Sequence, residues 1–318
     1  MEQPDATRVW RPDWPCAVRH VLAQQRRGGG DPTLRLAALG ERGQHWRASR
    51  TPEGPVTLAI ESRDPAGEVR ASAWGPGADW ALDQLPDLLG AADDWLGFEA
   101  RHPVVAEAWR RYPHVRLGRT ARPFEALVPT IIEQKVTGKE AFAGFRALVL
   151  KYGEPAPGPG AAVGLHLQPT AEVVANIPSW AWLGLHIDPA RSRALVTVAR
   201  HAEALERIVR GSTSSDLRSS SKLDRAVRSV PGLGVWTSAE IRARALGDPD
   251  AVSFGDYHVA KDVGWALSGR EFDDRELSDV LEPWRPHRGR VPLLLGEAGI
   301  RRPRRGHRAS LRGHFPHV

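Results

Sequence analysis

The sequence predicts an α+β fold class, in which a small N-terminal antiparallel β domain precedes a mostly α-helical domain. Before residue 75, three short segments alternate apolar and polar residues with a period of two, which is typical of half-buried strands. From His102 nearly to residue 300, apolar residues recur with helical spacing. The chain has 318 residues, of which 41% are hydrophobic. At roughly 150 residues per domain, this length corresponds to about two domains with filled cores. We therefore expect an N-terminal domain at 1–100, a helical domain at 101–300 and a disordered basic tail at 301–318.

The N-terminal domain is expected to contain a meander of three strands. The strands are predicted over residues 44–50, 55–61 and 68–74. In the second strand, Val56, Leu58 and Ile60 share one face, because alternate residues of a strand point the same way. Turn-forming residues such as Pro and Gly separate the strands. A helix is predicted to follow over residues 79–89.

The second part of the chain is expected to be helical. Helices are predicted over residues 103–111, 124–136, 139–152 and 189–209, with a Pro/Gly-rich loop at 154–164. Thr137 and Glu140 form a capping box at the start of the third helix, and Asp188 caps the fourth. Pro129 lies inside the second helix and should kink it near Glu125, because proline lacks the N–H that the helix needs.

Composition restricts the classes of function. Lys and Arg number 44 against 38 Asp and Glu, and the resulting positive charge favours an anionic partner such as nucleic acid. A single cysteine, Cys16, excludes an intramolecular disulfide framework and a four-cysteine zinc site. No apolar run approaches the roughly 18 residues of a membrane span, and the first residues lack the pattern of a signal peptide. We expect a soluble cytoplasmic protein that has no membrane contact and binds no metal. Within the cytoplasm, we expect it to associate with the nucleoid through DNA.

Residues 231–234, with the sequence PGLG, join two predicted helices, of which the second runs from about Val235 to Ala245. Glycines allow the positive φ angles and the close approach that a backbone contact to phosphate requires. Free N–H groups at the start of the second helix favour an anion there. Two interpretations stay open, namely a phosphate-binding hairpin and an ordinary helix–turn–helix bend. The hairpin residues are Pro231, Gly232, Leu233 and Gly234.

This segment resembles a known family. Residues 230–237, VPGLGVWT, are similar to the hairpin of the helix-hairpin-helix (HhH-GPD) DNA glycosylases, in particular to the 3-methyladenine DNA glycosylase II (AlkA-like) branch, which carries Trp at the position of Trp236. Three further segments resemble the same branch in family order. They are PFEALVPTIIEQKVTG at 123–138, SFGDY at 253–257 and LEPWRPHRGR at 281–290. The resemblance covers roughly residues 123–295 and implies a helical glycosylase domain behind a small β domain.

The resemblance implies a monofunctional DNA glycosylase of base excision repair. Such an enzyme flips an alkylated purine, of the 3-methyladenine type, out of duplex DNA and hydrolyses its glycosidic bond to leave an abasic site. The implied partner is double-stranded DNA that contains damaged bases, and the protein is expected to be a monomer. No cofactor is expected, although a monovalent cation could bind the backbone carbonyls of the hairpin. Two alternatives remain: a glycosylase for another lesion, such as a deaminated base, and a catalytically silent protein that binds DNA damage.

By the same resemblance, Asp256 is the catalytic carboxylate, which would stabilise positive charge on the deoxyribose or activate water. An aspartate at a helix start is also an ordinary N-cap, and the two roles can coexist. Trp236 would offer an aromatic face to a cationic base, or it would pack in the core. Members that also cut the strand carry a lysine nucleophile at the position of Trp236. Tyr257 is the second aromatic residue expected in the base pocket.

Two residues of the loop after the second predicted helix are expected to contact DNA. Lys135 occupies the position of the wedge that fills the space of the flipped base, and its charge suits a phosphate contact. Gln134 would bind base or backbone, or it would face solvent. Glu240 departs from the branch, because it stands one helical turn beyond Trp236 where an aromatic pocket residue is expected. Gly296 departs likewise, near the expected place of a further tryptophan.

Overall fold

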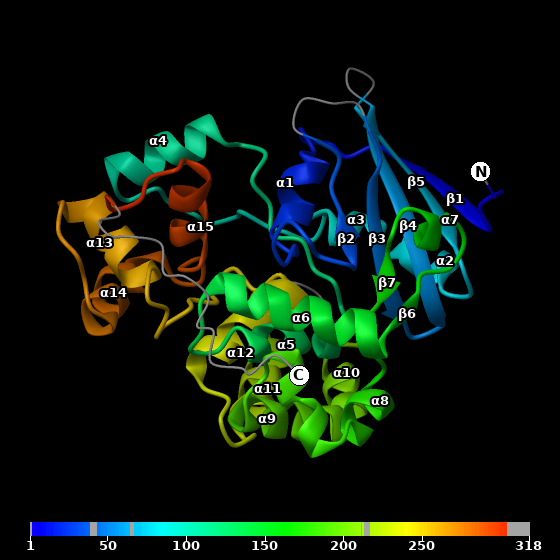
Figure 1. The fold of residues 1–318 in the computed structure, drawn as a ribbon. Coiled ribbons are helices and arrows are strands. Elements are labelled where there is room, and N and C mark those ends of the chain that lie inside the picture. Colours follow the sequence, from blue (N-terminus) through cyan, green and yellow to red (C-terminus); the bar gives the residue numbers. More distant parts are fainter. Residues whose placement is uncertain (1, 39–42, 64–66, 211, 213–216, 304–318) are drawn as a thin grey trace.

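The computed structural model describes residues 2–38, 43–63, 67–210, 212 and 217–303, and all structural statements here refer to these residues. The N-terminal part contains a five-stranded antiparallel sheet of order β1-β5-β4-β3-β2 (Figure 1). The strands are β1 (Ala6–Trp10), β2 (Leu34–Arg35), β3 (His45–Thr51), β4 (Gly54–Arg63) and β5 (Glu68–Trp74). The three predicted strands are confirmed as the centre of the sheet. The edge strands β1 and β2 were not predicted, since Arg8 interrupts the apolar alternation of β1 and β2 has two residues.

One face of the sheet is covered by three short helices. They are α1 (Val18–Ala23), α2 (Ala78–Asp83) and α3 (Leu85–Leu88). Val56, Leu58 and Ile60 are buried against this layer, as the period-two pattern predicts. The single helix predicted over 79–89 is wrong in detail, because it divides at Gln84 into α2 and α3. Pro86 explains the break, since it cannot donate the backbone hydrogen bond that would continue the helix.

The opposite face of the sheet is covered by a segment from far along the chain. It comprises β6 (Glu154–Pro155), α7 (Pro159–Ala162) and β7 (His166–Leu167). The first two lie where the sequence predicted a loop over 154–164, and β7 follows that loop. The backbone N–H of His166 donates to Pro32 O at 2.8 Å, and Thr57 Oγ1 donates to Pro157 O at 2.7 Å. Residues 154–167 therefore complete the core of the N-terminal domain.

The remaining helices form two bodies with separate hydrophobic cores (Figure 1). The first body contains α5 (Pro123–Ile132), α6 (Gly138–Tyr152), α8 (Ala171–Asn176), α9 (Pro189–Arg200), α10 (Ala202–Val209), α11 (Leu217–Arg228) and α12 (Val235–Ile241). The second contains α4 (Pro103–Arg111), α13 (Val259–Ser268), α14 (Asp274–Leu281) and α15 (Arg290–Glu297). The predicted capping box at Thr137 and the N-cap at Asp188 are confirmed. The helix predicted over 189–209 is interrupted at His201.

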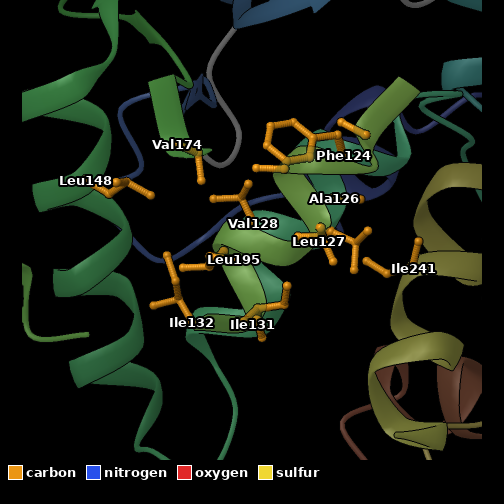
Figure 2. Packing of buried hydrophobic residues seen from close by; sticks show 14 of the residues in the cluster. Phe124, Ala126, Leu127, Val128, Ile131, Ile132, Leu148, Val174, Leu195 and Ile241 are labelled. Atoms are coloured by element: carbon orange, nitrogen blue, oxygen red, sulfur yellow. The ribbon is translucent and has the colours of Figure 1, made fainter. Parts of the chain in front are cut away.

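Helix α5 is the centre of the first helical body, because all ten of its residues are buried. Figure 2 shows Leu127, Val128 and Ile131 between side chains of neighbouring helices, including Leu195 of α9 and Ile241 of α12. The helix ends at Ile132, four residues before the predicted end at 136. This shorter helix leaves residues 133–137 as the loop expected to contact DNA.

Pro129 deprives the Glu125 carbonyl of its helical donor, as predicted. The Gln168 side-chain amide replaces that donor at 3.1 Å. The Glu125 carboxylate is buried and accepts from Ser49 Oγ at 2.7 Å and from the backbone N–H of Arg50 at 2.5 Å. One residue of α5 therefore joins the helical body to strand β3 of the N-terminal sheet.

Among the described residues, no helix is long and apolar enough to cross a membrane. Nor do three or more His, Cys, Asp or Glu side chains gather there as a set that could hold a metal ion. Of the basic tail, residues 304–318 lie outside the described residues. Arg302 is placed, and its guanidinium binds Glu271 at 2.7 Å.

Candidate active site

The hairpin lies between α11 and α12, as the sequence predicts. Gly232 has a φ of +89°, which favours glycine. Gly234 has a φ of −109°, so the expectation that both glycines need a positive φ is wrong for Gly234. A Cβ added at either glycine would meet nothing within 4 Å. Leu233 does not face outward with its neighbours, because its side chain is buried in the core of the first helical body.

Gln134 holds the hairpin in place. Its Nε2 donates to the carbonyl of Gly232 at 3.2 Å and to Thr237 Oγ1 at 2.8 Å. The alternative that Gln134 simply faces solvent is therefore wrong. The structure brings the loop after α5 and the hairpin together, although about a hundred residues separate them in sequence. A carbonyl oxygen keeps a second lone pair, so these contacts leave the expected cation site on the hairpin carbonyls as a prediction.

Lys135 and Trp236 present side chains near this junction. Lys135 is exposed and has a φ of +55°, which is uncommon for a residue other than glycine. Trp236 is half-buried, and it is not a member of the core cluster that contains Leu233 and Ile241. The indole therefore remains available for a contact outside the core.

Asp256 lies in the segment that passes from the first helical body to the second, just before α13. Its Oδ1 accepts the backbone N–H groups of His258 at 2.7 Å and Val259 at 3.0 Å. His258 occupies the N-cap position of α13, so Asp256 is not the N-cap weighed from the sequence, although it binds N–H groups at the start of this helix. Among the described residues, Oδ2 has no hydrogen-bond partner, and the residue is partly exposed. One oxygen holds the carboxylate in position while the other remains free for chemistry.

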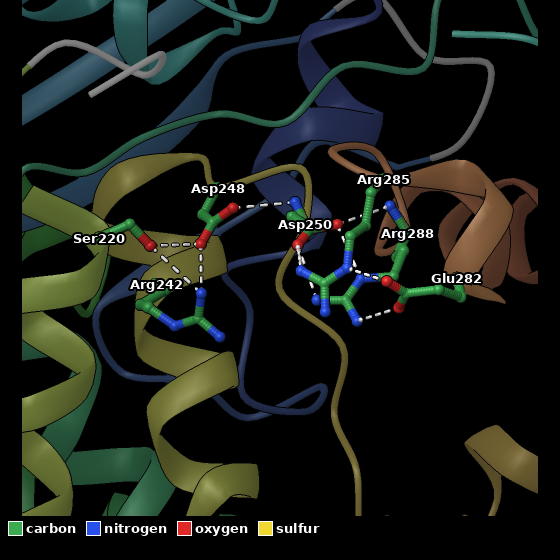
Figure 3. A network of polar contacts seen from close by, with 7 residues as sticks. All are labelled: Ser220, Arg242, Asp248, Asp250, Glu282, Arg285 and Arg288. Atoms are coloured by element: carbon green, nitrogen blue, oxygen red, sulfur yellow. Dashed lines mark hydrogen bonds and ion pairs between the residues drawn. The ribbon is translucent and has the colours of Figure 1, made fainter. Parts of the chain in front are cut away.

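The segment that leads to Asp256 is fixed by two carboxylates, the buried Asp248 and the half-buried Asp250 (Figure 3). Asp248 binds Arg242 and Ser220 of the first helical body. Asp250 accepts Arg288 Nη2 at 2.7 Å and Arg288 Nε at 2.9 Å from the second body. These contacts restrict the path of the backbone between the two bodies.

Tyr257 lies beside Asp256 but is 67% exposed. The Lys261 ammonium lies 3.8 Å from the centre of its ring, and the Arg302 guanidinium lies 5.5 Å from it. Arg302 and Lys261 hold the pKa of the Tyr257 hydroxyl below its usual value. Two cations therefore lie against an exposed ring that was expected to line the base pocket, and its role in that pocket stays a prediction.

Sequence reasoning missed a set of charged side chains near these residues, formed by Arg27, Glu133, Glu240 and Arg244. One signal was available, since Glu240 and Arg244 are spaced i,i+4 on one helix face. Arg27 and Glu133 are 106 positions apart in the sequence, so no local sequence pattern could predict their contact.

No family model matches the chain. Its sequence is 30% identical over 211 residues to a probable bifunctional transcriptional activator/DNA repair enzyme AlkA of Mycobacterium tuberculosis, which covers 65% of this chain and 37% of that protein. The chain therefore spans little more than a third of that curated relative.

Solved structures define the class of fold. A 3-methyladenine DNA glycosylase from Archaeoglobus fulgidus is 17% identical with a TM-score of 0.66, over 81% of this chain and 88% of that one. An 8-oxoguanine glycosylase/lyase of Clostridium acetobutylicum is 12% identical with a TM-score of 0.67, over 93% and 97%. The protein has the fold of these DNA glycosylases. The predicted fold class is confirmed, and the expected resemblance to the AlkA branch agrees with the sequence similarity to an AlkA protein.

Proposed function

We propose that the protein is a monofunctional DNA glycosylase that removes N-alkylated purines from duplex DNA. The observation that carries the proposal is Asp256, a part-buried carboxylate with one bonded and one free oxygen on a fixed segment between two helical bodies. Departure of a base leaves positive charge on the deoxyribose, which a carboxylate held in this way would stabilise. The shared fold and the similarity to an AlkA protein support the same class.

The choice of an alkylated purine rests on Trp236. An N-alkylated purine is cationic, and a cation on an aromatic face gains about 0.5–2 kcal/mol. Such a base is already a good leaving group, so no separate general acid is required. The half-buried indole lies on the helix that begins at the hairpin, where the DNA backbone would be bound.

The choice of a monofunctional reaction rests on the absence of an amine in the hairpin and α12, whose sequence is PGLGVWTSAEI. Strand cleavage by a glycosylase/lyase requires a nucleophilic amine to form a Schiff base. Lys261 is the lysine nearest in sequence to Asp256, and its ammonium is held against the face of Tyr257. We expect no covalent intermediate at this lysine.

The test uses duplexes that each carry one lesion: an N-methylated purine, an ethenoadenine, hypoxanthine, uracil or 8-oxoguanine. We expect abasic sites from the alkylated purines, in strands that break only after alkali. Borohydride trapping should give no covalent complex with the wild-type protein or with Lys261→Ala. Excision confined to a deaminated base would favour the other-lesion alternative. Binding of lesions without excision would favour the damage-binding alternative.

The hairpin should bind DNA phosphate through its backbone, with no information about the base. Gly234→Val tests this, because Gly234 has an ordinary φ and open surroundings, so valine adds bulk without strain. We expect affinity for damaged and undamaged duplex to fall equally, by about tenfold, or about 1.4 kcal/mol. Fluorescence anisotropy at several salt concentrations measures both affinities.

The matched control for this prediction is Gly184→Val, since Gly184 is also exposed with nothing within 4 Å of an added Cβ. Its affinity should equal that of the wild type. If Gly234→Val binds undamaged duplex as tightly as Gly184→Val does, the hairpin is a structural bend only. Gly232→Val is less informative, because a β-branched residue at a φ of +89° would be strained.

A further inference from the structure

Four charged side chains form a shielded cluster beside the candidate site. Arg27 Nη1 donates to both carboxylate oxygens of Glu133, at 2.9 and 3.0 Å. Arg244 Nη1 binds Glu240 Oε2. Side-chain exposure is 6% for Arg27, 17% for Glu133, 16% for Glu240 and 20% for Arg244. Two positive and two negative charges compensate one another in a site with little solvent.

The cluster joins three elements that the proposed reaction uses. Arg27 belongs to the N-terminal domain and follows α1. Glu133 ends α5, immediately before Gln134 and Lys135. Glu240 and Arg244 lie on α12 and on the π-helical turn Arg242–Leu246 that continues it from the hairpin. The N-terminal domain therefore contributes a charge to the junction of the hairpin and the DNA-contact loop.

A chain of two hydrogen bonds leads from this cluster to Asp256. Ser253 Oγ donates to Glu240 Oε1, and the carbonyl of Ser253 accepts the backbone N–H of Asp256 at 3.1 Å. Burial raises the pKa of Glu240, but Arg244, the Ser253 hydroxyl and Arg27 outweigh burial and hold that pKa below its usual value. Glu240 is therefore an ionised acceptor at neutral pH.

This contact differs from the other two on the same segment. Asp248 and Asp250 fix the segment near its start, six and more residues before Asp256. The Ser253 contact is the last side-chain bond to the first helical body before Asp256, within the part of the chain that the structure describes. A buried ion cluster is weak support for stability, since its desolvation cost offsets much of its attraction. A role in holding the active-site segment in one geometry therefore explains the cluster better than a contribution to stability does.

We propose that Glu240 is a positioning residue for Asp256, acting through the Ser253 hydroxyl, and that Arg244 and the neighbouring Arg27–Glu133 ion pair hold Glu240 for this task. The inference rests on the proposed function. It assigns to Glu240 the orientation of the reacting carboxylate, and it assigns to the N-terminal domain a part in building the active site.

The test is Ser253→Ala, which removes the bond to Glu240 and leaves all four charges in place. A displaced carboxylate should lower the single-turnover excision rate by about 10- to 100-fold. Affinity for a duplex with an abasic-site analogue should stay within about twofold of wild type, because the hairpin is untouched. Ser253→Thr keeps a hydroxyl and should restore most of the rate. Glu240→Gln combined with Ser253→Ala should be no slower than the slower single variant.

The matched control is Ser268→Ala, which removes a serine hydroxyl bonded to the Gly264 carbonyl of α13 at 2.9 Å and should leave the rate unchanged. If the wild-type enzyme excises the base and Ser253→Ala excises it as fast as Ser268→Ala does, the inference is overturned. The inference is also overturned if Ser253→Ala loses affinity for the duplex by the same factor as it loses excision rate. Amide hydrogen exchange provides a readout independent of activity, and Ser253→Ala should speed exchange at Asp256. If the wild type excises nothing, the proposed function fails, and unchanged exchange would then overturn the positioning role separately.

Discussion

Asp256→Asn should reduce excision of an alkylated purine by about a thousandfold or more, while binding of the damaged duplex is kept. Asparagine retains Oδ1, which accepts the N–H groups of His258 and Val259 at the start of α13. It replaces the free Oδ2 by an amide, which carries no charge to stabilise the sugar cation or activate water. The single-turnover excision rate should therefore fall while the affinity for the damaged duplex stays constant.

A matched control for this prediction exists in the next helix. Asp273 caps α14 through a capping box with Glu276 and lies on no element of the candidate site. Asp273→Asn should excise at the wild-type rate. Near-normal turnover by Asp256→Asn would remove Asp256 from the reaction. Asp256→Ala is a poorer probe, because losing the bonds at the start of α13 costs about 1 kcal/mol of stability in addition to the charge.

The largest effect on stability is expected at Arg290, whose side chain is fully buried. Arg290 Nη1 donates to Asp93 Oδ2 at 2.9 Å, Nη2 lies 2.7 Å from Asp93 Oδ1, and the guanidinium stacks 4.2 Å from the ring centre of Trp95. Arg290→Ala would leave the Asp93 carboxylate buried without its cation. We expect the free energy of unfolding to fall by about 3–5 kcal/mol, as measured by urea denaturation.

Arg110→Ala is the control, since Arg110 pairs with Glu107 on the surface of α4 with 75% of its side chain exposed. An exposed pair contributes about 0–1 kcal/mol. Arg290→Lys keeps the charge but cannot form the two parallel bonds, so its stability should lie between that of the wild type and Arg290→Ala. If Arg290→Ala loses no more stability than Arg110→Ala, the buried pair does not hold the second helical body to residues 93–95.

The sequence by itself determined the elements whose signals are local. The alternation of Val56, Leu58 and Ile60 placed a central strand, because one face of a strand must be buried. The capping box at Thr137 and the N-cap at Asp188 placed helix starts, because these side chains bond to N–H groups within three residues. The hairpin was found for the same reason.

Tertiary structure alone decided the contacts that assemble the candidate site. Residues 154–167 join the sheet, Gln134 holds Gly232, and Ser253 bonds to Glu240. Nothing local requires any of these, since a side-chain amide or hydroxyl accepts many partners and its neighbours are set by how the helical bodies pack. For Asp256 the sequence indicated the position, and its bonds to His258 and Val259 are local. The packing of the two helical bodies decided what surrounds its second oxygen.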